Sequence, residues 1–235
     1  MPSASSIKVT NVNRLITSRI LKGKVLFQDD MEGSNLANKY HTTGGSGIDT
    51  TYLFMHDQSF KIDSGAGAGS IGGIRKSIPL PIGDSKIGVE FYFLMENDAD
   101  SDLEFLLRFE SKNRGYSYRK EAGIKISWLS KPRYLNASNN FVVFPDSYGT
   151  KIIDFGAHDG IHGVWHNTGL IVDFDNLRYK KFWLDDVIVS FNEEIATTTN
   201  SAAYYDALWL YIRCRTNKAS SQYCYIDSII VTQEE

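Results

Sequence analysis

Three short apolar runs separated by polar turn residues occupy residues 163–191, and this pattern constrains the fold more than any other stretch. Polar residues 173–178 separate the first run from the second, and Asp185 with Asp186 separates the second from the third. Short apolar runs bounded by such turn residues are typical of β-strands joined by hairpins. We therefore predict a strand, a hairpin, a second strand, a tight turn and a third strand.

The same pattern continues along most of the chain, where short apolar and aromatic runs alternate with polar or glycine-rich segments. Aromatic residues make up 13% of the 235 residues, which suits strands better than helices. Three pairs of runs are predicted to form further hairpins: 52–55 with 59–62, 87–95 with 103–110, and 208–214 with 222–232. Many short strands in a chain of this length predict one all-β domain, either a sandwich or a barrel.

Residues 1–23 differ from the rest, because their apolar side chains are scattered among Ser, Thr, Asn, Lys and Arg. We predict an N-terminal arm over residues 1–23 and a single β-sandwich domain over residues 24–235. Such an arm can dock on its own domain or add a strand to the sheet edge of a neighbouring subunit.

Charge and hydropathy bear on the partners and the location of the protein. The formal net charge is −3, which gives no general attraction to nucleic acid or to an anionic membrane. The apolar runs are too short to span a membrane. Residues 1–6 lack the apolar segment of a signal peptide, so we expect a protein that stays in the cell or leaves it inside a released particle such as a virion.

Cys214 and Cys224 are the two cysteines of the chain. Period-two alternation places both thiols on the apolar faces of the last two predicted strands. Two alternatives stay open, a disulfide if the register pairs the residues and two buried thiols if it does not. The chain offers neither cysteine a Cys or His partner at metal-ligand spacing, so we do not expect a zinc site.

Three segments together resemble the concanavalin A-like, laminin-G-like jelly-roll superfamily. They are Trp-His at 165–166 followed by Trp-Leu-Asp-Asp at 183–186, Phe-Gln-Asp-Asp-Met-Glu at 27–32, and Tyr-Ile-Asp-Ser-Ile-Ile-Val at 225–231. Asp186 departs from the pattern, because the family usually has Gly there. The resemblance covers residues 24–232 and implies an antiparallel jelly-roll sandwich of two sheets, with the first and last strands side by side. It also implies glycan or protein binding on one face.

A structural Ca²⁺ ion between the first and last strands is common in this superfamily. Asp30, Glu32 and Asp227 occupy the matching positions, so the resemblance implies calcium ligands there. The alternative is that Asp227 caps or hydrogen-bonds a loop without metal.

Glycan binding and glycoside hydrolysis make different demands on the chain. Binding needs exposed aromatic platforms with polar groups nearby, and Trp128, Tyr134 and Tyr148 are the candidates; Trp165 and Trp183 are expected in the core. Hydrolysis needs two carboxylates flanking the scissile bond. The run 87–95 offers only Glu90, and the next run adds no third acid at the spacing of the laminarinase-like branch, so we predict no catalytic residues.

We predict a non-enzymatic structural or assembly protein, such as a virion surface or capsid-decorating subunit that docks through residues 1–23. The lack of a signal peptide and of a catalytic constellation favours this hypothesis. The alternative is a carbohydrate-binding module, favoured by the resemblance and the aromatic content. A glycoside hydrolase with unrecognised acids is a third hypothesis.

Overall fold

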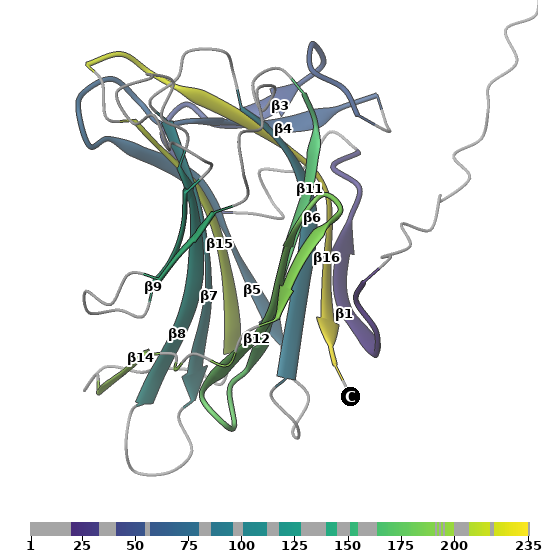
Figure 1. The fold of residues 1–235 in the computed structure, drawn as a ribbon. Coiled ribbons are helices and arrows are strands. Elements are labelled where there is room, and N and C mark those ends of the chain that lie inside the picture. Colours follow the sequence, from purple (N-terminus) through teal and green to yellow (C-terminus); the bar gives the residue numbers. More distant parts are fainter. Residues whose placement is uncertain are drawn as a thin grey trace, which may run out of the picture.

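The computed structural model describes residues 20–32, 41–54, 57–79, 86–95, 101–111, 118–127, 140–144, 151–154, 164–190, 192, 194, 196–199, 207–216 and 219–234. These ranges contain 16 β-strands, which form two eight-stranded antiparallel sheets stacked face to face (Figure 1). Over the same ranges there is no helix long and apolar enough to cross a membrane. The predicted all-β, two-sheet sandwich is confirmed, whereas residues 1–19 of the predicted arm lie outside the described ranges.

The sheet that we call sheet A carries the first and last strands. Its spatial order is β13 (Val187–Ser190), β12 (Arg178–Leu184), β11 (His166–Asp173), β6 (Lys86–Met95), β16 (Tyr223–Gln233), β4 (Ser59–Asp63) and β3 (Gly47–Asp49). β1 (Lys24–Asp29) pairs with the second half of β16, and β4 pairs with the first half. The first and last strands are therefore neighbours, as the resemblance implied.

The opposing sheet B is built around the long strand β15. Its spatial order is β10 (Lys151–Asp154), β9 (Asn140–Phe144), β8 (Tyr118–Ser127), β7 (Ser101–Ser111), β15 (Ala207–Thr216), β5 (Ile71–Pro79) and β2 (His41–Thr43), and β14 (Ala196–Thr199) pairs with β8. β15 pairs with β7 on one side and with β5 on the other over nearly its whole length. It is therefore the central, fully paired strand of this sheet.

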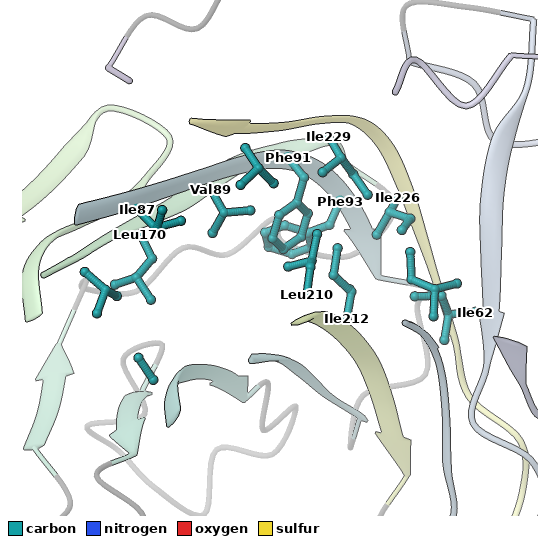
Figure 2. Packing of buried hydrophobic residues seen from close by; sticks show 14 of the residues in the cluster. Ile62, Ile87, Val89, Phe91, Phe93, Leu170, Leu210, Ile212, Ile226 and Ile229 are labelled. Atoms are coloured by element: carbon teal, nitrogen blue, oxygen red, sulfur yellow. The ribbon is translucent and has the colours of Figure 1, made fainter. Parts of the chain in front are cut away.

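The hydrophobic core fills the space between the sheets. Alternate residues of β6 and of β15 point inward, so Phe91 and Phe93 of β6 lie against Leu210 and Ile212 of β15 (Figure 2). One polar group crosses this core: the hydroxyl of Tyr179 accepts a hydrogen bond from the backbone N–H of Gly123 at 3.0 Å and donates to its carbonyl oxygen at 3.3 Å. A buried tyrosine of sheet A is thus bonded to the backbone of sheet B.

The hairpins of residues 166–190 are confirmed. β11, β12 and β13 are consecutive antiparallel neighbours in sheet A. Asp173 closes the first turn, where its Oδ1 accepts from the backbone N–H of Asn176 at 2.9 Å and its Oδ2 accepts from Nδ2 of the same residue at 2.9 Å. Asp185 lies in the second turn at a positive φ of 51°.

The other three predicted hairpins are wrong. β6 lies in sheet A and β7 in sheet B, and β15 and β16 are separated in the same way. β4 pairs with β3, whereas residues 52–54 form no strand. Alternation shows which side of a strand is apolar, but it does not distinguish a hairpin from a connection that crosses to the opposite sheet.

The outer face of sheet A is itself covered at one end by the residues that precede β1. Trp183 has 0% exposure although it points away from the core between the sheets, and it packs in a second cluster with Leu21, Ile171 and Ile230. The backbone N–H of Lys22 donates to both carboxylate oxygens of Glu234 at 3.1 Å. Residues 20–22 therefore dock on the chain's own domain. Trp183 is buried as predicted, but outside the main core.

Cys214 and Cys224 face each other across the sandwich from β15 and β16. Both thiols are free and buried in the main core, and the Cys214 thiol donates to the carbonyl oxygen of Gln222 at 3.9 Å. Burial raises the pKa of the Cys224 thiol well above its usual value, and the adjacent Cys214 raises it further. The structure corresponds to the second alternative, two buried thiols.

Candidate functional site

The predicted calcium ligands are held by other partners. Oδ1 of Asp30 accepts from the backbone N–H of Glu32 at 3.1 Å, and Oε1 of Glu32 accepts from the backbone N–H of Gln58 at 2.9 Å. Asp227 is fully buried in β16 and accepts from the hydroxyl of Ser228 at 3.0 Å. Within the described ranges, no group of three or more His, Cys, Asp or Glu side chains is placed to hold a metal ion. As placed, these carboxylates do not fit a calcium site, and calcium binding stays a prediction.

The predicted glycan platforms Trp128, Tyr134 and Tyr148 lie outside the described residues. Another aromatic surface lies on the outer face of sheet B, where the side chains of β15 and β5 are described. Because Leu208, Leu210, Ile212 and Cys214 point into the core, the alternate residues of β15 point outward. These outward residues are Trp209, Tyr211, Arg213 and Arg215. Arg75 joins them from β5, where it pairs with Tyr211 in register.

Guanidinium groups and aromatic rings pack against each other on this surface, which we call the β15 face. The guanidinium carbon of Arg75 lies 4.9 Å from the centre of the Trp209 ring, and that of Arg213 lies 4.9 Å from the Tyr211 ring. The two rings are 6.4 Å apart between centroids and inclined by 39°. Stacking of this kind favours one orientation of the flat guanidinium and holds long side chains in place.

Three buried N–H donors of the β15 face have no acceptor among the residues that the structure describes. They are Nε of Arg75, Nε1 of Trp209 and Nε of Arg215. Buried polar atoms without partners are rare in folded proteins, because each one costs about 1–3 kcal/mol. Three such donors on one sheet face point to an acceptor supplied from outside the described residues.

Backbone register shows what flanks the β15 face on β7. Trp209 lies opposite Arg108, whereas Arg213 lies opposite Glu104 and Arg215 lies opposite Asp102. On the other side of β5, Arg75 pairs with His41. The end of the face at Trp209 and Arg75 thus has no acidic register partner, whereas the end at Arg215 has two.

A second aromatic cluster lies on the outer face of sheet A. Phe54, which is 38% exposed, stacks on Tyr92 at 4.3 Å and lies 5.6 Å from Trp165. Trp165 is therefore half-buried beside an exposed ring instead of lying in the main core. The polar side chains nearby already bond to each other: Nδ2 of Asn167 donates to Oε1 of Glu90 at 2.9 Å. This surface is the more apolar of the two.

The β15 face can do two things chemically. The half-buried ring of Trp209 can pack on the apolar C–H face of a sugar, with the ring of Tyr211, only 9% exposed, behind it, and the N–H donors can bind hydroxyl or carboxylate oxygens. The sequence itself indicates the β15 face, because Trp-Leu-Tyr-Ile-Arg-Cys-Arg at 209–215 alternates aromatic or basic residues with apolar ones. The alternation that indicates an apolar inner face also indicates this aromatic and basic outer face.

No protein-family model matches the chain, and no curated protein sequence matches it. In three dimensions the chain is similar to several lectins. Lectin II from Ulex europaeus matches with a TM-score of 0.58 at 13% identity, over 89% of this chain and 98% of that one. Peanut lectin matches with a TM-score of 0.58 at 12% identity, over 87% and 95% respectively. Lectin I-B4 from Griffonia simplicifolia matches with a TM-score of 0.58 at 12% identity, over 88% and 98%. These likenesses show the fold, a concanavalin A-like jelly-roll sandwich.

Proposed function

We propose that this protein binds carbohydrate, without catalysis, on the β15 face. The observation that carries the proposal is the group of three unpartnered N–H donors set around Trp209 and Tyr211. Aromatic rings with a few polar groups beside them are what a sugar site needs. The similarity of the fold to lectins supports the same function, because it supplies a scaffold on which other chains bind sugars.

The test is a binding measurement on an immobilised glycan array, followed by isothermal titration with the glycans that bind. Trp209→Ala should weaken binding by about tenfold or more, since truncating a central aromatic contact commonly costs over 1 kcal/mol. Phe54→Ala is the matched control, because it removes a partly exposed ring from the other sheet. Equal loss in both variants, or binding that survives Trp209→Ala, would contradict the assignment to the β15 face.

The assembly role of residues 1–23 stays a second hypothesis, which is compatible with sugar binding. The described end of the arm, residues 20–22, is bonded to this chain's own sheet A. A truncation that tests assembly should therefore end at residue 19, so that the contacts of Leu21 are kept. Loss of oligomers in that truncated chain, measured by light scattering, would support docking on other subunits; an unchanged native mass would count against it.

A further inference from the structure

The β15 face carries more positive charge than a site for neutral sugars requires. Arg75, Arg213 and Arg215 lie on it together, and the structure records no ion pair between them and any carboxylate among the described side chains. We infer that the ligand is an acidic polysaccharide whose sugar rings bear carboxylates, and that Arg75 binds the carboxylate. This inference rests on the proposed function and narrows it to one substrate class.

Arginine geometry favours a carboxylate over a hydroxyl. One edge of a guanidinium presents Nε–H and an Nη–H in parallel, and that pair matches the two oxygens of a carboxylate. In Arg75 and Arg215 the Nε–H lacks an acceptor among the described residues, so this edge is not satisfied in either of them. A carboxylate would satisfy both atoms of the edge, whereas a single hydroxyl would satisfy one.

Register distinguishes Arg75 from the other two arginines. Arg213 and Arg215 lie opposite the acidic positions Glu104 and Asp102 of β7. Arg75 lies between Tyr211 on β15 and His41 on β2, so neither register partner is acidic. The guanidinium of Arg75 also stacks on Trp209, whose own Nε1–H lacks an acceptor. Arg75 and Trp209 together offer a cation, an aromatic ring and a buried N–H donor that has no acceptor among the described residues. These three groups can bind the carboxylate, the ring and a hydroxyl of one uronic acid unit.

Aromatic rings beside arginines also suit single-stranded nucleic acid, where bases stack on the rings and phosphates pair with the cations. The formal net charge of −3 disfavours that ligand, because sequence-independent affinity for nucleic acid depends on many phosphate contacts. Nucleic acid is therefore an outcome of the test and not the proposal.

The experiment compares pairs of polymers in which esterification neutralises the carboxylates of the same sugar units. Full-length protein is titrated with polygalacturonate and with highly methyl-esterified pectin, and with alginate and its propylene glycol ester. We expect at least one acid polymer to bind about tenfold or more tightly than its ester, since loss of a charge-assisted pair commonly costs about 1.5–3 kcal/mol. Binding of the acid form should also weaken as salt rises from low to physiological concentration.

Three variants identify the residue. Arg75→Gln should weaken binding of the acid polymer more than binding of the ester and so remove the preference for the acid polymer. Arg75→Lys should restore only part of that preference, because lysine keeps the charge but lacks the paired N–H groups of the guanidinium. Arg178→Gln is the matched control, since it removes an arginine of sheet A that pairs with Glu194 at 3.0 Å. The melting temperature of each variant shows whether it is folded. If Arg75→Gln does not fold, the salt dependence of binding and the affinity of Arg75→Lys still test whether Arg75 binds the carboxylate.

The outcomes separate the two proposals. Equal affinity for acid and ester, or binding of neutral glycans alone, overturns the acidic ligand and leaves carbohydrate binding standing. No binding to either polymer pair or to the glycan array overturns both. Tighter binding of oligothymidylate than of any polyuronate, lost in Arg75→Gln, assigns the face to nucleic acid and overturns both as well.

Discussion

Two tryptophans show how far the face and the burial of a single side chain can be predicted from the sequence. Trp183 and Trp209 both sit in alternating strands, and both point away from the core between the sheets. Trp183 is fully buried because Leu21 and Ile230 cover it, and Gly169 leaves room for its ring on the neighbouring strand. The covering residues are distant in sequence, so period-two alternation could predict the face but not the burial.

Asp173 is a residue whose charge stabilises a turn, and its effect depends on pH. Burial alone would raise its pKa, but hydrogen bonds from Asn176 and the nearby ammonium groups of Lys180 and Lys86 outweigh it, so the pKa lies below the usual value. We expect Asp173→Asn to lower the free energy of unfolding at pH 7 by about 1 kcal/mol, measured by urea denaturation.

The sign of the pH dependence follows from the lowered pKa. The stabilisation by ionised Asp173 is fully present above the pKa of an unfolded aspartate, about 3.9, and is lost as the pH falls through the lower folded value. The difference between wild type and Asp173→Asn should therefore be constant from pH 7 to pH 5 and should shrink below pH 4. A difference that grows towards acid pH would contradict this role.

At the scale of elements, the apolar faces of β15 and β16 and the hairpins of residues 166–190 are confirmed, whereas the other predicted hairpins are wrong. The hairpins of residues 166–190 were identified because Asp173 and Asp185 occupy tight turns. β6 with β7 and β15 with β16 were predicted as hairpins because their apolar patterns match. In a sandwich, two strands on opposite sheets face the same core and show the same pattern, so pairing depends on long-range contacts that one sequence does not reveal.

Residues 20–22 act as a short structural element that closes the outer face of sheet A. Leu21 is only 8% exposed, in contact with Gly88 and in a cluster with Trp183. We expect Leu21→Ala to lower the free energy of unfolding by about 2 kcal/mol, since the cavity would open at the edge of the molecule and not at its centre. Thermal and urea denaturation measure this, with Val25→Ala as the control because Val25 is 51% exposed. Equal stability of the two variants would show that this element contributes nothing.

The thiols of Cys214 on β15 and Cys224 on β16 lie at the same end of the core, on strands of different sheets. Since both are buried and the pKa of Cys224 is raised, we expect neither to react with a disulfide reagent in the native protein at pH 8. Unfolding in guanidinium should release two equivalents. Fast reaction of one thiol in the native state would mean that this end of the sandwich opens, and absence of thiol after unfolding would mean that a disulfide had formed.

At the scale of the whole molecule, the two outer faces are used differently. The outer face of sheet A is partly covered by residues 20–22, and its polar groups Glu90, Asn167 and Trp183 bond to one another, with Trp183 donating to Asn167 at 2.8 Å. The outer face of sheet B presents donors without acceptors among the described residues. The fold therefore places the β15 face, which we propose binds the ligand, and the partly covered face of sheet A on opposite layers, with the core between them.

The hydrogen bonds from Lys22 to Glu234 bring the two ends of the described chain together on sheet A. Residues 22 and 234 therefore lie together on the layer behind the β15 face. A chain coupled to a particle or a resin through the side chain of residue 22 would have the β15 face on the layer opposite the point of attachment. Many copies arrayed in this way would engage one polymer at several points, and weak single contacts would combine into strong retention.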